Sequence, residues 1–409
     1  MNLLLGADSL AALRSGVGRM TLEIATALRH HRGVNGMRLL VGDAVLNPDW
    51  LDALPDPAPP SPPSRLRTWL QTIPAARLLR DRTVRARLAR AARALEHHPT
   101  VRAQSSDKYA WQNKTLQPGQ PTLYFEPNMI AKPFDGPTVA GFNDLSWLHC
   151  PGAHPAERVA WIERRLPATL CQANRFVAIS AFTARAMQAE FGIPSSRIDV
   201  VPLAPGPEFR PRGEAAITPI LARHGLRHRS YVLAVSTLEP RKNFDGLLAA
   251  WSTLPTADRT ATPLVVVGAR GWGEVLESPT ARAALANGTL RLPGHLPDED
   301  LAALYAGCAV FAYVSHYEGF GLPILEAMAS GAPVIASSTT ACSETAGKAA
   351  LLVQPEDHTA ITAALHRILN DPALAETLRQ RGIAHAQTFN WATTADRLMA
   401  SFNRALSSS

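Results

Sequence analysis

The stretch EGFGLPILEAMASGAPVIAS, residues 318–337, predicts a tight loop that leads into a helix and then into a short buried strand. Gly319 and Gly321 allow the main chain to approach a ligand closely because they carry no Cβ. We expect the helix to run from about Pro323 to Ser330, since proline suits a first helical turn, where no amide hydrogen is needed. Free N–H groups at the start of a helix attract anions. The stretch therefore predicts a phosphate-binding junction.

Two glutamates occupy different places in this stretch. Glu318 precedes the glycines at the mouth of the loop, and Glu326 lies one turn inside the helix. Glycine-rich turns before helices are common in α/β proteins, and taken alone Glu326 reads equally well as a solvated helix residue. The combination of both acids, both glycines and the proline is far more specific, with one acid in reach of a sugar and the other in reach of a ribose.

The whole string resembles the E-x7-E region of glycosyltransferase family 4, whose members are retaining enzymes of the GT-B fold that move a sugar from a nucleotide diphosphate donor. The resemblance implies that Glu318 contacts the donor sugar and that Glu326 contacts the ribose hydroxyls. The loop amides that it assigns to the diphosphate are those of Gly319, Phe320, Gly321 and Leu322.

Length and composition indicate a soluble α/β protein with more than one domain. A chain of 409 residues is long for one hydrophobic core, so we expect two Rossmann-like, doubly wound domains, which the GT-B resemblance places on either side of a central cleft. The expected ranges are 1–207, 208–385 and, for a final helix that the resemblance returns to the first domain, 386–409. The four cysteines form no CxxC or Cys/His cluster, which argues against a zinc site and a disulfide framework.

Two features of the sequence lead us to expect a cytoplasmic protein. The N-terminus indicates a first strand rather than a signal peptide, because it has no basic region and only a short apolar run. No stretch approaches the ~20 apolar residues that are needed to span a bilayer.

Short apolar segments alternate with helical ones, which indicates parallel sheets with helices on both faces. The segments are NLLLGAD, MRLLVG, TLYFE, TVAGFND, RFVAIS and DVVPL in the first half, and YVLAVS, PLVVVG, TLRLPG, CAVFAYVS, APVIAS and AALLV in the second. A proline- and glycine-rich hinge at residues 203–219 separates the halves. Ligands of doubly wound sheets bind beyond the carboxyl ends of the strands, so we expect the loops after these segments to meet at one edge.

The net charge of +7 is concentrated in residues 65–98, where nine arginines, from Arg65 to Arg93, stand against Asp81 and Glu96. Apolar residues between the arginines allow a helix with one basic and one apolar side. Such a helix either packs on its own domain or docks on anionic lipid at the inner face of the cytoplasmic membrane. The family resemblance favours the membrane, because many such transferases act on lipid-linked acceptors. Nucleic acid is not an expected partner, since no recognition motif accompanies the arginines.

Arg241 and Lys242 follow the segment YVLAVS, just ahead of a helix that Asn243 is expected to cap. Two cations beside a helix N-terminus can offset the charge of a diphosphate without Mg²⁺. By itself an Arg-Lys pair at a helix start is usually solvated, but its place here resembles the donor-phosphate pair of the family. Many members carry Gly-Arg at the strand end, where this chain has Ser236 and Thr237, so Arg241 has to stand in for that arginine.

Gly16 and Gly18 open a helix after the first strand. Thr21 stands where the third glycine of a dinucleotide-binding G-x-G-x-x-G would be, and no acid closes the next strand, so we expect neither a nicotinamide nor a flavin cofactor. The pattern resembles the glycine loop of the family, which implies that both glycines lie close to the donor phosphate and the acceptor.

The segment FNDLSWLHCPGAHP, residues 142–155, resembles the H-D-L-S segment of the family, whose histidine contacts the transferred sugar. Asn143 stands in place of that histidine, and asparagine can orient a hydroxyl but cannot exchange a proton near neutral pH. This is compatible with a reaction in which the leaving diphosphate itself takes the proton of the acceptor. Asp144 either anchors the loop or meets the acceptor, and we expect His149 and His154 to be structural or surface residues.

The segment from Gly294 resembles the strand-turn-helix beside the nucleotide base, which implies that the backbone of His295 and Leu296 reads the base edge. Taken together, the resemblances imply a retaining, metal-independent and cofactor-free glycosyltransferase with Arg241, Lys242 and Glu318 as catalytic residues. Likeness to enzymes of bacterial polysaccharide or lipid-linked glycan assembly favours mannose transfer from GDP-mannose. The alternatives are a UDP- or dTDP-sugar donor, a GT-B nucleotide-sugar epimerase and a non-catalytic membrane-binding module.

Replacing three or four of the arginines between Arg77 and Arg93 by glutamine is expected to weaken binding to anionic vesicles, because each basic side chain near such a surface contributes about 1 kcal/mol. Co-sedimentation with vesicles measures the loss, and hydrolysis of soluble donor should stay intact. Unchanged vesicle binding would show that this segment is not the membrane contact.

Overall fold

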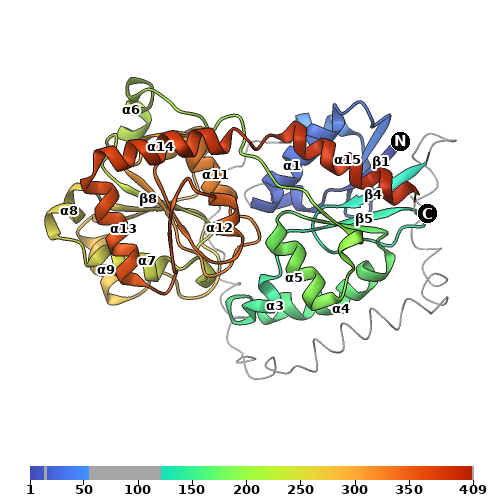
Figure 1. Cartoon of the computed structure of the whole chain (residues 1–409), viewed down its shortest axis with the longest axis horizontal. Coiled ribbons are helices and arrows are strands. Elements are labelled where there is room, and N and C mark those ends of the chain that lie inside the picture. Colours follow the sequence, from blue (N-terminus) through green and yellow to red (C-terminus); the bar gives the residue numbers. More distant parts are fainter. Residues whose placement is uncertain (13–15, 55–120, 408–409) are drawn as a thin grey trace. The chain divides into compact units, whose positions relative to one another are not determined.

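A computed structural model describes residues 1–12, 16–54 and 121–407 of the chain (Figure 1). The chain divides into two compact units: unit 1 comprises Met1–Pro202 together with Trp391–Ser409, and unit 2 comprises Leu203–Asn390. The first boundary thus falls five positions before the expected one, at the start of the proline-rich hinge segment. The arginine-rich residues 65–98 lie outside the described residues.

Unit 1 is built on a sheet with the strand order β3-β2-β1-β4-β5-β6-β7, in which only β3 runs antiparallel to its neighbour among the described strands. Its strands are β1 (Asn2–Gly6), β2 (Gly36–Val41), β3 (Ala44–Leu46), β4 (Thr122–Glu126), β5 (Thr138–Phe142), β6 (Arg175–Ala178) and β7 (Ile198–Val200). Strands β1 and β5 are buried at every position, which is why they read as continuous apolar runs. Because β1 lies between β2 and β4, the chain winds in both directions from the centre of the sheet.

Among the described residues, the α-helices of unit 1 are α1 (Gly16–Arg29), α3 (Ser146–His149), α4 (Ala156–Gln172), α5 (Ala181–Phe191) and α15 (Trp391–Ser407). Helix α15 packs beside α1 and against β5 and β6 (Figure 1). Its Phe402 is fully buried, with its ring centroid 5.1 Å from that of Phe125 on β4. Arg404 on the same helix pairs with Asp199 at 2.7 Å. The last helix of the chain therefore completes the core of unit 1.

Unit 2 contains an all-parallel sheet with the strand order β10-β9-β8-β11-β12-β13. Its strands are β8 (Val232–Val235), β9 (Leu264–Val267), β10 (Leu290–Gly294), β11 (Val310–Tyr313), β12 (Val334–Ser337) and β13 (Leu351–Val353). Each of them lies within one of the apolar segments that the sequence analysis expected to be a strand. The chain turns back at the β8–β11 pair, so that the ends of these two strands form the switch point of the sheet.

The helices of unit 2 are α6 (Glu214–Arg223), α7 (Phe244–Ser252), α8 (Thr256–Ala261), α9 (Pro279–Ala286), α10 (Asp298–Gly307), α11 (Leu322–Ala329), α12 (Thr340–Ala346), α13 (His358–Asn370) and α14 (Pro372–Ala386). Helix α11 begins and ends one residue earlier than expected, with Pro323 in its first turn. Helix α13 packs on α7, and α14 packs on α11.

Two local features differ from the sequence expectation. The short strand β3 was not foreseen; it folds back on β2 through a two-residue turn in which Gly42 has a φ of +57°. Asn243 occupies the N-cap position of α7, but its side chain does not cap the helix. Its amide instead donates to the carbonyl oxygens of Val314 at 3.0 Å and Pro355 at 2.7 Å, so it ties the loop after β8 to two other loops.

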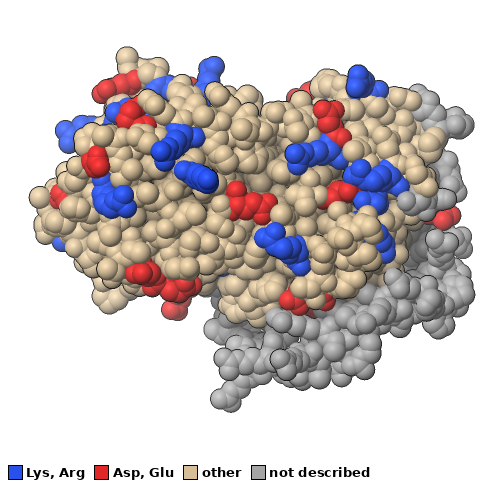
Figure 2. Space-filling model, viewed as in Figure 1, with Lys and Arg blue, Asp and Glu red and all other residues tan. Residues whose placement is uncertain are grey.

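The charges of the described residues are mixed. On the face shown in Figure 2, basic and acidic side chains alternate over the described surface without a large patch of one sign. None of the helices within the described ranges is both long enough and apolar enough to cross a bilayer.

Candidate active site

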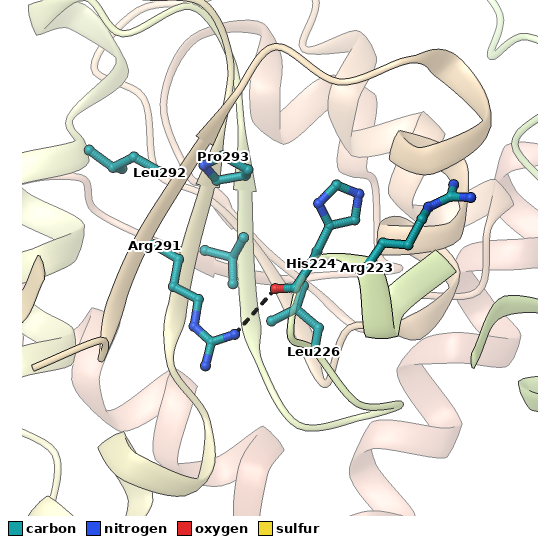
Figure 3. Close-up of a pocket in the computed structure, with 7 residues that line it drawn as sticks. Arg223, His224, Leu226, Arg291, Leu292 and Pro293 are labelled. Atoms are coloured by element: carbon teal, nitrogen blue, oxygen red, sulfur yellow. Dashed lines mark hydrogen bonds between the residues drawn. The ribbon is translucent and has the colours of Figure 1, made fainter. Parts of the chain in front are cut away.

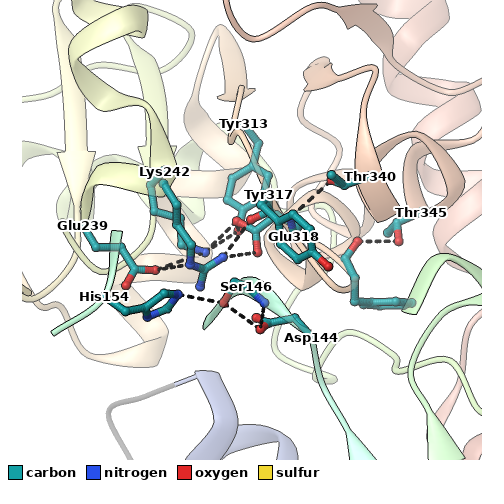
Figure 4. A network of polar contacts seen from close by, with 12 residues as sticks. Asp144, Ser146, His154, Glu239, Lys242, Tyr313, Tyr317, Glu318, Thr340 and Thr345 are labelled. Atoms are coloured by element: carbon teal, nitrogen blue, oxygen red, sulfur yellow. Dashed lines mark hydrogen bonds and ion pairs between the residues drawn. The ribbon is translucent and has the colours of Figure 1, made fainter. Parts of the chain in front are cut away.

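The loops that follow β8 and β11 lie at the switch point of the unit 2 sheet and bring together the three residues expected to be catalytic. Arg241 and Lys242 lie in the 3₁₀ helix η8 (Pro240–Lys242) after β8, and Glu318 lies in the loop after β11. The Lys242 ammonium is 2.6 Å from Glu318 Oε1, and Arg241 Nη1 is 3.1 Å from Glu318 Oε2 (Figure 4). Arg241 also donates to the carbonyl oxygen of Tyr317 at 2.9 Å. One carboxylate therefore holds both cations.

A second carboxylate, Glu239, belongs to the same cluster and was missed by the sequence analysis. Its Oε1 is 2.8 Å from Arg241 Nε and 4.0 Å from the Lys242 ammonium, and the residue is 2% exposed. The signal that could have found it is its position, because it directly precedes Pro240 in the same short segment as the two cations. The cluster thus contains two cations and two carboxylates.

Burial and pairing have opposite effects on the acidity of Glu318. Burial alone would raise the pKa of this carboxyl, but the charges of Lys242 and Arg241 outweigh it and lower the pKa to about 2. The hydroxyl of Tyr313, which burial keeps neutral by raising its pKa well above the usual value, donates to Glu318 Oε1 at 2.9 Å. Glu318 is therefore an anion at any physiological pH.

The main chain of the Glu318 loop is fixed by α12. Thr340 Oγ1 accepts from the amide of Glu318 at 3.2 Å, and Thr345 Oγ1 donates to the carbonyl of Phe320 at 2.6 Å. Gly321 adopts a φ of +92°, which residues with a Cβ rarely adopt, and ends the loop at the start of α11. Within the described residues the amides of Gly321 and Leu322 donate no hydrogen bond. The carbonyl oxygen of Phe320 is thus hydrogen-bonded within the protein, whereas the amides of Gly321 and Leu322 at the start of α11 are available to an anion.

Glu326, the second acid of the E-x7-E stretch, is not a solvated helix residue. It is 6% exposed, and its Oε2 accepts from the hydroxyl of Tyr305 on α10 at 3.0 Å. The structure therefore rules out the solvated alternative that the sequence left open.

Ser236 and Thr237 lie in the loop after β8, which is packed tightly on the loop after β9. A Cβ on Gly268 would lie 1.8 Å from the carbonyl oxygen of Ser236, so only glycine fits there. The amide of Gly268 donates to the carbonyl of Gly294 at 2.9 Å, at the end of β10. His295 and the buried Leu296 follow directly. The loops after β8, β9 and β10 are therefore joined along one edge of the sheet.

The remaining expected site residues lie in unit 1. Gly16 and Gly18 begin α1, and nothing lies within 4 Å of the position that a Cβ on Gly16 would take. Asn143 follows β5 and donates through Nδ2 to Asn128 Oδ1 at 3.2 Å. Asp144 accepts from the amide and the hydroxyl of Ser146 at 2.8 and 2.7 Å. Of the two roles expected for Asp144, the structure shows the first, which is to anchor the loop.

The two histidines near this loop have structural contacts. His154 Nε2 is 2.9 Å from the hydroxyl of Ser146, which also binds Asp144, and His149 Nε2 is 3.6 Å from Glu190 (Figure 4 shows His154). Both contacts agree with the expectation that these two histidines are structural or surface residues.

A pocket of about 310 Å³ in unit 2 contains none of these residues. Its walls are formed by Arg223, His224, Leu226, Val265, Arg291, Leu292 and Pro293 (Figure 3). Its cations are engaged with protein: Arg223 pairs with Asp300 at 2.6 Å, and Arg291 donates to the carbonyl of Gly225 at 2.7 Å. Because Val265 and Arg291 lie near the beginnings of their strands, the pocket is not at the carboxyl edge where the ion cluster lies.

Among the described residues, no group of three or more His, Cys, Asp or Glu side chains is arranged to hold a metal ion.

Comparison with known proteins identifies the family. Residues 220–385 match the family described as Glycosyl transferases group 1. The chain is 33% identical over 382 residues to O-antigen chain mannosyltransferase B of Escherichia coli, an alignment that covers 92% of this chain and 93% of that protein. The chain belongs to the group 1 glycosyltransferases. The glycosyltransferase activity predicted from the E-x7-E stretch is thereby confirmed.

Solved structures confirm the fold class of this glycosyltransferase. Sucrose-phosphate synthase from Thermosynechococcus elongatus matches with a TM-score of 0.63 at 20% identity, over 100% of both chains. HepE of Anabaena, solved in complex with UDP-glucose, matches with a TM-score of 0.65 at 17% identity, over 99% of this chain and 100% of that one. At such identities the likeness concerns the fold alone, which is the predicted GT-B fold.

Replacing Glu318 by glutamine is expected to destabilise the glycosyltransferase in a pH-dependent way. The folded pKa of about 2 lies below the ordinary 4.5, so ionised Glu318 contributes stability above pH 4.5 that is lost as the pH falls toward 2. The difference in unfolding free energy between wild type and Glu318→Gln should therefore narrow by about 2 kcal/mol between pH 4.5 and pH 3. Urea unfolding at pH 7, 5, 4 and 3 measures it.

The exposed Glu299→Gln on α10 serves as the control and should show a small, pH-independent difference. A gap for Glu318→Gln that stays constant down to pH 3 would contradict the ion-paired state of Glu318.

Proposed function

We propose that this glycosyltransferase moves mannose from GDP-mannose to a glycan or lipid-linked acceptor, with retention of the anomeric configuration and without a metal ion. The observation that carries the proposal is the cluster of Arg241, Lys242 and Glu318 beside the available amides at the start of α11. The likeness over almost the whole chain to an O-antigen chain mannosyltransferase supports the choice of mannose and of a glycan acceptor.

The cluster suits a diphosphate for an electrostatic reason. Glu239 and Glu318 already balance the charges of Arg241 and Lys242, so the site is close to neutral before a donor binds. An arriving diphosphate is held by N–H groups of Arg241 and Lys242 and by the amides of Gly321 and Leu322. The positive end of the α11 dipole adds to this attraction. The diphosphate is thus bound by hydrogen bonds and by the helix dipole, without Mg²⁺.

The proposed reaction takes place on one face of the sugar. The bond between the anomeric carbon and the diphosphate oxygen breaks, and Lys242 and Arg241 stabilise the negative charge that develops on the leaving group. The acceptor hydroxyl attacks the same carbon from the same side, and its proton passes to an oxygen of the leaving diphosphate. No protein base is required, which fits the presence of Asn143 at the position where the family has histidine.

The two acids of the E-x7-E stretch have separate parts in this proposal. Glu318 is held as an anion, so it accepts hydrogen bonds from hydroxyls of the donor sugar and stays charged during the reaction. Glu326, oriented by the Tyr305 hydroxyl, accepts from the ribose hydroxyls.

The alternative functions differ in what happens to the donor. A transferase slowly releases nucleotide diphosphate even without acceptor, a GT-B epimerase converts the sugar without release, and a non-catalytic membrane-binding module does neither. The family membership favours the first. A UDP- or dTDP-sugar in place of GDP-mannose would leave the chemistry unchanged.

We also propose that the protein attaches peripherally to the inner face of the cytoplasmic membrane through residues 65–98. Within the described part of the chain, the exposed face of α4 supports this proposal. Trp161 is 41% exposed on that face, and the guanidinium of Arg165 lies 5.0 Å from its ring centroid, with Arg158 also exposed. An exposed tryptophan among arginines is typical of helices that rest on an anionic lipid surface.

The donor is tested most directly by thermal shift. A ligand that binds only the folded state stabilises it by about 2.7 kcal/mol at a concentration of 100 Kd, so the true donor should raise the melting temperature most. We expect GDP-mannose to give a larger shift than UDP-glucose, UDP-galactose or dTDP-sugars at equal concentration. A larger shift with a UDP- or dTDP-sugar would overturn the choice of GDP-mannose.

Two variants separate the roles within the donor site. Lys242→Ala should lower turnover by ~10²-fold or more, because it removes a charge that stabilises the leaving diphosphate. Glu326→Ala should act mainly by weakening donor binding, since it removes a ribose contact. Steady-state kinetics and donor titrations measure both effects, with the exposed Lys348→Ala as control. Wild-type rates from correctly folded Lys242→Ala and Glu326→Ala would refute the site assignment.

A further inference from the structure

A chain of hydrogen bonds runs along the carboxyl edge of the unit 1 sheet, from the buried carboxylate of Glu126 through the exposed Asn128 to Asn143. Glu126, the last residue of β4, accepts from the Tyr124 hydroxyl at 2.8 Å through Oε2 and from the amide of Asn128 at 3.0 Å through Oε1. Asn128 Oδ1 in turn accepts from Asn143 Nδ2 at 3.2 Å. A buried carboxylate is thereby linked in two steps to the asparagine that stands in place of the family histidine.

The backbone around Glu126 leaves no room for a different arrangement. A Cβ on Gly6, at the end of the neighbouring strand β1, would lie 2.2 Å from Glu126 Oε2. A Cβ on Gly141, near the end of β5, would lie 2.9 Å from the carbonyl oxygen of Pro127. The two glycines on either side of β4 thus allow the carboxylate and the following turn to sit close against the sheet edge.

The carboxylate pays a desolvation penalty at this place that no adjacent cation offsets. Burial raises the pKa of Glu126 from its ordinary 4.5 to about 7, although the Tyr124 and Asn128 hydrogen bonds act in the other direction. The other charged groups that face it are Asp8, whose charge raises the pKa further, and Lys132, whose charge lowers it. These two are paired with each other at 2.9 Å. Glutamate is thus a costly choice at this position, which indicates a task beyond packing.

The orientation of Asn143 shows what this task is. Its Nδ2 is committed to Asn128, so its Oδ1 is directed away from that contact, and within the described residues this buried oxygen has no hydrogen-bond partner. A buried carbonyl oxygen without a donor is unfavourable, and a hydroxyl of a bound ligand would supply the missing hydrogen bond.

We propose that Glu126 is a positioning residue that acts through Asn128 to orient Asn143, so that the Asn143 carbonyl oxygen accepts a hydrogen bond from a hydroxyl of a sugar substrate. The ionised form of Glu126 is the form that orients Asn143. The inference rests on the proposed function, because it takes a sugar hydroxyl as the ligand. Glu126 lies outside the motifs that carry the family resemblance.

The ionised form is the active one because of the donors around it. Both oxygens of the ionised carboxylate accept, one from Tyr124 and one from the amide of Asn128. When the Glu126 carboxyl is protonated, its new O–H group needs a hydrogen-bond acceptor. The Tyr124 hydroxyl oxygen already accepts from the amide of Lys132 at 3.2 Å. It can accept from Glu126 as well only if the Tyr124 hydroxyl hydrogen rotates away from the carboxyl. Protonation therefore rearranges the network that holds Asn128. Tyr124 itself stays neutral, because burial raises its pKa well above the usual value.

The first test follows transfer rates with pH. Wild type should show kcat/KM for the acceptor rising through an apparent pKa near 7, and Glu126→Gln should lose that rise and be about tenfold slower at pH 8. Tyr124→Phe removes a hydrogen bond that favours the ionised form, so it should move the rise to higher pH. The thermal shift that GDP produces by itself should be the same in all three proteins, because GDP carries no sugar for Asn143 to contact.

The control for a general carboxyl effect is Glu163→Gln on α4, whose pKa is also raised by burial and which lies outside the network. It should keep the wild-type pH profile.

Thermal melting at pH 8 shows whether Glu126→Gln is still folded. A carboxyl whose pKa is raised in the folded protein favours folding below its unfolded pKa, and this contribution is lost as the pH rises through the folded pKa of about 7. At pH 8 the wild-type carboxyl therefore adds no stability, and Glu126→Gln should not melt earlier than wild type. A wild-type pH profile in Glu126→Gln would overturn the proposal.

The second test needs no activity. In protein labelled with ¹⁵N-asparagine, the side-chain amide signal of Asn143, assigned by its loss in Asn143→Asp, should shift with a midpoint near pH 7 in wild type and stay fixed in Glu126→Gln. An Asn143 signal that shifts identically in both proteins would refute the coupling. A signal that behaves as expected in a protein that transfers no mannose from GDP-mannose would support the coupling and overturn the proposed function instead.

Discussion

The unit 2 site depends on one buried interaction, in which Glu318 holds both Lys242 and Arg241. Glu318 lies more than seventy positions after the adjacent Arg241 and Lys242, and it meets them because β8 and β11 are neighbours in the sheet. Desolvation makes each charge costly alone, and only close pairing offsets this cost. The pairing is thus a weak source of net stability but a strong constraint on geometry. If any one of the three side chains moved away, a buried charge would be left without a counter-ion. It fixes the beginning of the loop that leads to the amides of α11.

Two buried glutamates show that counter-charge, rather than depth of burial, decides the state of a carboxyl in this protein. Glu318 and Glu126 are 6% and 8% exposed. Glu318 faces two cations, and its pKa falls to about 2; Glu126 accepts only from a neutral hydroxyl and an amide, and its pKa rises to about 7. The first is therefore a permanent anion, suited to meet a substrate, whereas the second changes its state within the physiological pH range.

Much of the architecture could be predicted because its signals are local. Buried parallel strands appear as apolar runs in the sequence. Gly319 and Gly321 predict the loop, and Pro323 predicts the start of α11. The double hydrogen bond of Asn243 was missed, because its partners come from loops that are distant in sequence and become neighbours only in the folded sheet. Glu239 and the Glu126 network were missed although their partners are near in sequence, because the residue pattern does not show which of these side chains are buried or toward which neighbour they turn. Strand β3 was missed because three residues carry too little pattern. The arginine-rich residues 65–98 remain a prediction from composition.

The position of α15 has a consequence for how the chain is made. Unit 2 is continuous in sequence, whereas unit 1 is interrupted by it and is completed only when Phe402 packs against Phe125. During synthesis, unit 2 can fold as soon as it leaves the ribosome, but the apolar surface that α15 covers in unit 1 stays open until the last helix emerges. The nascent first half therefore has to avoid aggregation for the time that it takes to translate nearly two hundred further residues.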